Sequence, residues 1–341
     1  MYAGIDVPDQ PSLVSWASLV ELGDGRVQFR CADFAFTLAH PVFVTALRRI
    51  TARLDGQHTI SEIAASAGSD IAPTTVVFLI KILRANGLIQ AGGVGVSGHD
   101  PRYTEFLSHF GDADVLHRAL AHAQVDVVGA GELADCTRGA LKSVGIGQLR
   151  SFDSITDWGD AVLAGPPPPA PDTPAPDTPG PALLVAVADG PAHGLFDAVN
   201  DTCLDAGIRW LRLCAQGTRI LLGPTVLPHQ SACYTCYELR AEASITEREG
   251  YHLYRDEIRR GVRDGDEGML TALAQVAAHQ TAMEVMRLLT GMSAPATIGK
   301  VYELTALSPK AAAEDVLRVP RCRSCGRARV HRDAWGPQHT G

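Results

Sequence analysis

Apolar and polar residues alternate along the first part of the chain with the two-residue period of β-strands. The alternation covers residues 12–22 and resumes over 26–38, and Gly23-Asp24-Gly25 between them has the composition of a tight turn. The sequence therefore predicts a small antiparallel sheet in this part of the chain.

Three stretches with helical spacing follow these strands. They cover 41–54, 59–68 and 72–87; the first and third have proline at their start, and the second and third end in glycine. An extended run returns at 88–90. Strands, three short helices and a closing strand together predict a winged-helix domain over residues 1–95.

The third of these helices has more apolar residues than one core-facing stripe requires. A DNA-binding helix needs several basic or amide side chains to reach bases and phosphates, and this one offers mainly Lys81 and Arg84. Two explanations of the apolar excess stay open: it belongs to the core, or part of it lines a groove for a peptide that adds to the sheet edge. The residues concerned are Val76, Val77, Phe78, Leu79, Ile80 and Ile82.

The middle of the chain has the pattern of a nucleotide-binding fold. A helical stretch at 102–123 precedes a strand that begins at Val125, and the turn after it fits G-x-G-x-x-A, with its glycines at Gly129 and Gly131. Asp153 follows a second strand at about the distance expected of a Rossmann-type fold.

The order of the next elements strengthens this interpretation. A buried strand at 182–189, a helix at 196–206 that ends in glycine, and a strand at 208–214 continue the alternation of strands and helices. We therefore predict an α/β, Rossmann-type domain over residues 96–341.

Four of the eight cysteines form two Cys-x-x-Cys pairs, at 233–236 and 322–325. Four thiolates can hold a structural zinc ion in a closed tetrahedral site once the fold brings the pairs together. A redox pair and unrelated cysteines are the alternatives, but two copies without a thioredoxin-like context favour metal. The expected Zn²⁺ ligands are Cys233, Cys236, Cys322 and Cys325.

Two helices and a strand are predicted in the last third of the chain. Residues 238–263 form a charged stretch whose arginines suit either a solvated face or a partner-docking face. Residues 270–289 form a long apolar helix, in which His279 suits a core or interface position better than a metal site. Residues 301–304 have the pattern of a strand.

Composition restricts the class of function. The chain has 341 residues, 46% of them hydrophobic, and a formal charge of −8, which suits two globular domains and argues against a general nucleic-acid binder. Neither a signal-peptide pattern at the start nor an apolar run long enough to span a membrane is present. We expect a cytoplasmic location.

One span is strongly acidic. Between Ser151 and Ile208 the chain has nine aspartates and no lysine or arginine. Because phosphoryl chemistry on ATP needs positive charge around the phosphates, we do not expect ATP binding there. Within this span, residues 165–181 include nine prolines among seventeen residues, which predicts an exposed, semi-rigid linker rather than a site.

The first domain resembles the PqqD-like recognition element found in the biosynthesis of ribosomally made, post-translationally modified peptides. In that family a leader peptide lies as an extra strand between the third strand and the third helix. The resemblance implies leader contacts at the sheet edge and on the facing helix. The corresponding residues are Asp33, Phe34, Ala35, Phe36, Thr37, Leu38, Val77, Phe78, Lys81 and Arg84.

Residues 102–327 resemble the ThiF/MoeB superfamily of adenylating enzymes, in the order of their elements and in the paired zinc cysteines. Asp189 stands where that superfamily has a magnesium-binding aspartate, but Gly190 replaces the usual asparagine and Phe196 a usual arginine. No cysteine lies between the two pairs to form the thioester that some members use. The resemblance therefore implies a vestigial nucleotide site without catalytic residues, made of Gly129, Gly131, Asp153 and Asp189.

The two halves together resemble the leader-binding partner proteins of YcaO cyclodehydratases. The resemblance implies a non-catalytic subunit that binds a precursor leader and presents it to a separate YcaO enzyme, which uses ATP to form azolines from Cys, Ser or Thr in thiazole/oxazole-modified peptides and thiopeptides. The superfamily also implies a homodimer. Two alternatives stay open: ATP-dependent adenylation of a peptide or carrier C-terminus, and a winged-helix regulator with a ligand domain.

Overall fold

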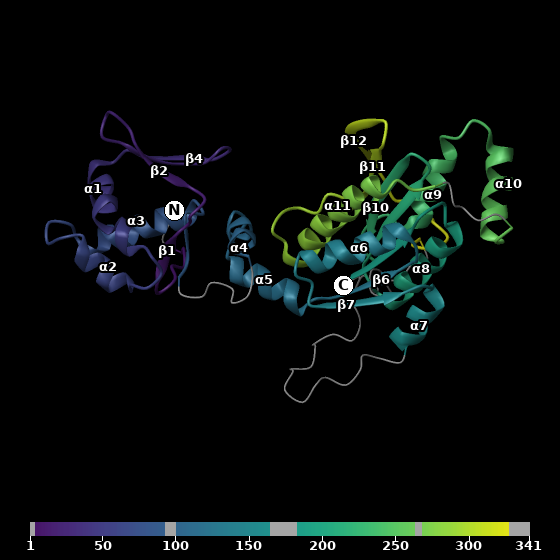
Figure 1. Ribbon diagram of the computed structural model, residues 1–341, viewed down its shortest axis with the longest axis horizontal. Coiled ribbons are helices and arrows are strands. Elements are labelled where there is room, and N and C mark those ends of the chain that lie inside the picture. The colour runs from purple at the N-terminus through teal and green to yellow at the C-terminus, as the bar shows by residue number, and fades with distance from the viewer. Residues whose placement is uncertain (1–3, 93–99, 164–182, 263–267, 327–341) are drawn as a thin grey trace, which may run out of the picture. The chain divides into compact units, whose positions relative to one another are not determined.

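The computed structural model describes residues 4–92, 100–163, 183–262 and 268–326 (Figure 1). The chain divides into two compact units, Met1–Ala119 and Leu120–Gly341. The proline-rich stretch at 165–181 lies outside the described residues.

The first unit contains the predicted antiparallel sheet. Its strands are β2 (Ser18–Glu21), β3 (Val27–Arg30) and β4 (Ala35–Leu38), in the order β2-β3-β4. The stretch expected as one strand over 26–38 is interrupted by a tight turn, in which the Cys31 N–H donates to the Phe34 carbonyl at 3.0 Å. Within the described residues β4 pairs only with β3, so it forms one edge of this sheet.

Three helices follow as predicted: α1 (Pro41–Ile50), α2 (Ile60–Ser66) and α3 (Pro73–Ala85), with a 3-10 turn η1 (Thr51–Arg53) after α1. Helix α2 begins with a capping box, because Thr59 accepts from the Glu62 N–H while the Glu62 carboxylate accepts from the Thr59 N–H. The closing strand β5 (Ile89–Ala91) pairs with β1 (Pro11–Leu13) in a separate two-stranded sheet.

A single apolar core serves these elements. It is built from side chains between Val14 and Ile89, among them Phe29, Leu47 and Leu79, all nearly or fully buried. This core lies entirely within residues 1–95, the range predicted for the first domain.

The helical prediction over 102–123 is confirmed except for a break at 109–112. The structure has two helices there, α4 (Pro101–Ser108) and α5 (Ala113–His122). Gly111 has a φ of 155°, and the Asp112 carboxylate accepts from the N–H groups of Asp114 and Val115, which starts a new helix.

The second unit is built on a seven-stranded mixed sheet in the order β12-β11-β10-β9-β8-β6-β7. The parallel part joins β7 (Gln148–Phe152), β6 (Gln124–Val128), β8 (Leu183–Ala188) and β9 (Trp210–Gln216). The antiparallel part adds β10 (Arg219–Val226), β11 (Lys300–Thr305) and β12 (Ser308–Asp315), of which β10 and β12 were not predicted. The predicted α/β class is confirmed.

Helices connect and cover these strands. Helices α6 (Glu132–Ser143), α7 (Ile155–Leu163) and α8 (His193–Ala206) join the parallel strands, and α11 (Thr271–Thr290) packs along α6 (Figure 1). His279 of α11 is exposed, so a core position is wrong for it. None of the helices in the described ranges combines the length and the apolar character needed to cross a membrane.

The charged helix expected over 238–263 is also wrong as one element. The structure has α9 (Tyr234–Ala243) and α10 (Arg248–Arg259), separated by residues 244–247. The break coincides with serine and β-branched residues, which favour helices weakly, and the Ser244 hydroxyl donates to the Ala241 carbonyl at 2.6 Å.

Candidate functional sites

The four predicted metal ligands meet in one buried cluster. Their Sγ atoms all lie within 4.8 Å of one another. Cys233 lies 3.8 Å from Cys236 and 3.7 Å from Cys322, and Cys236 lies 3.5 Å from Cys325. Sulfurs bound at about 2.3 Å to a tetrahedral zinc ion stand about 3.8 Å apart, so the cluster can hold a metal such as zinc.

Neighbouring groups fix these sulfurs. The Val319 N–H donates to Cys236 Sγ at 3.3 Å, and the hydroxyls of Thr235 and Ser324, one from each knuckle, lie 2.8 Å apart. The hydrogen bond between Cys233 and Cys236 lowers the pKa of Cys236 and raises the pKa of Cys233, so Cys236 is the first of the two to lose its proton. Because all four sulfurs are buried, the site has the closed character of a structural metal centre.

The glycine turn after β6 is required by a close approach to strand β8. A Cβ added to Gly129 would lie 2.0 Å from the Val187 carbonyl oxygen, and one added to Gly131 would lie 2.3 Å from Oδ2 of Asp189. Both glycines also have positive φ, 135° and 99°. Packing between these elements therefore accounts for both glycines.

The carboxylate of Asp189, which follows β8, binds the N-terminus of helix α6. Its Oδ2 accepts from the Glu132 N–H at 2.7 Å, and its Oδ1 accepts from the Leu133 N–H at 3.0 Å. These N–H groups are the ones a phosphate would use at a helix N-terminus after a glycine turn. Asp153 lies directly after β7, beside Gly129, and is exposed.

Replacing Asp189 with alanine should destabilise the second unit by about 1–2 kcal/mol, because the first turn of α6 loses its carboxylate cap. Urea unfolding monitored by circular dichroism measures this change. The matched control Asp153→Ala should change stability by less than about 0.5 kcal/mol. Equal effects of the two variants would show that the cap contributes nothing.

The two arginines that follow this turn along the chain bind acidic groups. Arg138 of α6 donates to the Gly129 carbonyl at 3.2 Å and pairs with Asp135. Arg150 of β7 donates to the buried Asp126 at 2.8 Å. Both arginines are therefore already paired with acidic side chains outside the span at 151–208, which itself has no lysine or arginine.

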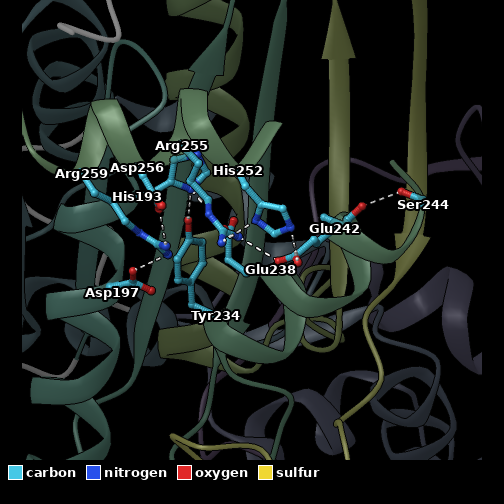
Figure 2. Close-up of polar contacts among 11 residues, drawn as sticks. His193, Asp197, Tyr234, Glu238, Glu242, Ser244, His252, Arg255, Asp256 and Arg259 are labelled. Carbon is cyan, nitrogen blue, oxygen red and sulfur yellow. Dashed lines mark hydrogen bonds and ion pairs between the residues drawn. The ribbon is translucent and has the colours of Figure 1, made fainter. Parts of the chain in front are cut away.

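Helix α10 is held against α8 and α9 by charged side chains (Figure 2). Arg259 donates to Asp197 of α8 at 2.7 Å, and Arg255 donates to Glu242 of α9 at 2.8 Å. His252 lies 3.1 Å from the same Glu242. None of the side chains of α10 is fully buried, and these ion pairs join the helix to α8 and α9 of the same chain.

A buried polar cluster lies one turn earlier on α9 (Figure 2). His193 Nδ1 is 3.1 Å from Glu238 and 3.3 Å from the Tyr234 hydroxyl. Burial raises the pKa of Glu238, but the hydrogen bonds from His193 and Tyr234, together with nearby positive charge, outweigh burial and lower that pKa. Arg212 of β9 lies with its guanidinium carbon 4.2 Å from the centre of the Tyr237 ring. This cluster was not predicted from the sequence, although one arginine in an apolar strand is a signal for it.

The predicted peptide contacts on the sheet edge differ in exposure. Asp33 lies in the turn before β4, and Phe34 makes an edge-to-face contact with Trp16 at 5.4 Å between ring centres. The side chains of Ala35 and Thr37 are exposed. Phe36 packs against the core as a half-buried residue, and Leu38 is 5% exposed, so the Leu38 side chain belongs to the core.

The predicted contacts on α3 lie beside its core stripe, which consists of Val76, Leu79, Ile80 and Leu83. Phe78 is 42% exposed, and its ring centre lies 5.9 Å from that of Phe43 of α1. Val77, Lys81 and Arg84 are half-buried, and Arg84 donates to the Ile89 carbonyl at 2.8 Å. Part of the apolar excess of this helix is therefore outside the core, as one of the two explanations requires.

No profile of a known protein family matches this chain, and no curated protein matches it in sequence. Solved structures do resemble it. The heterocyclase TruD has a TM-score of 0.69 at 18% identity, over 94% of this chain and 43% of the TruD chain. MccB of E. coli has a TM-score of 0.64 at 15% identity, over 93% of this chain and 97% of MccB.

This chain has the fold of MccB and of the part of TruD that it matches. A heterocyclase in complex with substrate and cofactor matches as well, with a TM-score of 0.67 at 16% identity over 93% of this chain and 39% of that one. The chain thus spans less than half the length of the two heterocyclases and nearly all of MccB. At these identities the likeness establishes the fold.

Proposed function

We propose that this protein binds the leader of a ribosomal precursor peptide and presents it to a separate YcaO-type cyclodehydratase, which forms azolines from Cys, Ser or Thr. The observation that carries the proposal is the likeness to heterocyclases, which extends over 94% of this chain and 43% of TruD. In this proposal the ATP-dependent chemistry belongs to the partner enzyme.

The first unit supports the peptide-binding part. We infer that residues 1–95 form a PqqD-like winged helix, since a single core joins its strands and helices. Strand β4 offers an edge to which an extended peptide can add, and the exposed Phe78 offers an apolar contact. The leader would therefore lie along β4 and against α3.

The second unit supports the non-catalytic part. Asp189 places a carboxylate on the N–H groups at the start of α6, where an anion would otherwise bind, and the span at 151–208 has no lysine or arginine. We infer that residues 96–341 are a ThiF-like platform that the four cysteines stabilise through Zn²⁺, and that ATP binding was lost. Homodimer formation and a cytoplasmic location stay predictions.

Fluorescence polarisation with labelled leader peptides from neighbouring precursor genes tests the proposal. One of these leaders should bind, and Phe78→Ala should weaken it by about 10-fold or more, since a buried aromatic anchor is worth roughly 1–3 kcal/mol. Lys81→Glu tests the charge on the same helix. Leu19→Ala, which removes an apolar side chain 37% exposed on the other edge strand, should bind like the unaltered protein. If no leader binds, the proposal fails.

A second candidate function is adenylation of a peptide or carrier C-terminus. The observation that favours it is the likeness to MccB, which covers nearly all of both chains, one of the matching MccB structures being a complex with ATP. ATP–pyrophosphate exchange separates the two candidates. We expect no exchange above background with any leader, and clear ATP-dependent exchange would favour adenylation over our proposal.

A further inference from the structure

A cavity of about 280 Å³ lies in the second unit between helix α11 and the antiparallel part of the sheet. Leu222 of β10 pairs with Tyr302 of β11, and Leu304 of β11 pairs with Ala311 of β12. Because residues two apart on a strand share a face, these four side chains form one wall of the cavity. That wall is apolar except for the Tyr302 hydroxyl.

Helix α11 forms the facing wall with polar side chains. Gln280, Glu284 and Arg287 line the cavity at spacings of four and three residues, which places them on one face of the helix. Between the two walls, Ala296 and Thr297 of the loop before β11 complete the lining.

Glu284 makes the polar wall rigid. It is 1% exposed; one of its oxygens accepts from the Thr297 N–H at 2.7 Å and from the Thr297 hydroxyl at 2.8 Å. The other oxygen accepts from Nη1 of Arg287 at 3.0 Å. The buried carboxylate therefore fixes the loop to α11 and orients the guanidinium of Arg287.

Several hydrogen-bonding groups at this cavity have no partner within the described part of the chain. They are the Nε–Nη2 edge of Arg287, the Gln280 amide and the Tyr302 hydroxyl. A guanidinium edge donates two parallel hydrogen bonds, a geometry that matches a carboxylate. The cavity thus combines an oriented carboxylate-binding edge with an aliphatic wall.

The geometry points to a binding site for a carboxylate on an aliphatic body. The carboxylate pairs with Arg287 next to Gln280 and Tyr302, and the aliphatic part packs on Leu222, Leu304 and Ala311. The volume lies just below the roughly 300–1,000 Å³ of sites for drug-sized ligands, so the occupant has about the size of one amino-acid residue. Free small acids and the C-terminal residue of a peptide both have this chemistry. This site is independent of the proposed leader groove in the first unit.

Isothermal titration calorimetry on the full-length, metal-loaded protein tests the inference with three probes: 4-methylpentanoate, a tripeptide that ends in leucine, and its C-terminal amide. At least one of the two probes with a free terminal carboxylate, 4-methylpentanoate or the tripeptide, should bind. Ala311→Leu fills the cavity from β12 and should weaken binding by about 10-fold or more. The matched control Ala312→Leu lies on the opposite face of the same strand and should leave binding within about twofold. Tyr302→Phe should weaken binding by about 2–10-fold.

Binding of the free acid alone identifies a small acid as the ligand type, and binding of the tripeptide alone identifies a peptide C-terminus. Equal binding of the tripeptide and its amide would overturn carboxylate recognition. Absence of binding at millimolar concentration, or equal effects of Ala311→Leu and Ala312→Leu, would overturn the site itself. Leader binding is measured separately on the same protein. The outcome of the calorimetry therefore neither supports nor contradicts the proposal that the first unit binds a leader.

Discussion

Removal of the proposed Zn²⁺ should unfold the second unit and leave the core of the first unit folded. The four sulfurs join the start of α9 to the turns after β12, two segments 89 residues apart in sequence. Structural zinc contributes about 10–16 kcal/mol in small zinc-binding peptides, which is comparable to the whole stability of a domain. The first unit has its own core between Val14 and Ile89 and includes no ligand of the site. Two-step thermal unfolding by circular dichroism, with and without a zinc chelator, measures the difference.

Single-residue variants separate metal loss from other effects of the chelator. Cys322→Ala should reproduce the chelated state, with about one zinc ion less per chain by a colorimetric metal assay. Cys136→Ala removes a half-buried thiol of α6 outside the cluster and should keep both the metal and the fold. The leader-binding affinity that we propose for the first unit should survive chelation. Loss of that affinity, or an unchanged second transition, would contradict the division into two separately stabilised parts.

The four-cysteine cluster could be predicted from the sequence because the spacing of the two cysteines within each pair is local. Cys233 and Cys236 are three residues apart at the start of α9. Their sulfurs therefore lie close together regardless of the sequence between this pair and Cys322. Similarly, β8 consists of six buried residues, and a continuous apolar run of that length predicts a central parallel strand without further information.

Features that depend on distant partners could not be predicted. Arg259 donates a hydrogen bond to Asp197, which lies 62 residues earlier in the sequence. The sequence of a charged stretch does not indicate which of its side chains will pair with such a distant residue. The capping of α6 by Asp189 likewise depends on the approach of β8 to the glycine turn. By contrast, the break between α4 and α5 has a local signal, since Gly111 and Asp112 form a stop and a new N-cap, and the helical periodicity around them concealed it.

The register of β4 identifies which of its backbone groups an added strand would use. The bond from the Cys31 N–H to the Phe34 carbonyl closes the turn, and Arg30 then pairs with Ala35 as a non-hydrogen-bonded pair. Hydrogen-bonded and non-hydrogen-bonded pairs alternate along the two strands, so the pair of Gln28 and Thr37 is also non-hydrogen-bonded. The N–H and carbonyl groups of Ala35 and Thr37 therefore point away from β3, toward the edge of the sheet.

Thr37→Pro should abolish leader binding or weaken it by at least about 10-fold, because it removes an outward N–H while leaving the bonds between β3 and β4 in place. Thr37→Val keeps that N–H and loses only the hydroxyl that accepts from Gln28, so it should bind normally. Leu19→Pro places the same substitution on β2, the opposite edge of the sheet, and should also bind normally. Fluorescence polarisation gives the affinities, and circular dichroism verifies that each variant folds. If Leu19→Pro loses the leader and Thr37→Pro retains it, the peptide adds to β2, and the contacts assigned to β4 are wrong.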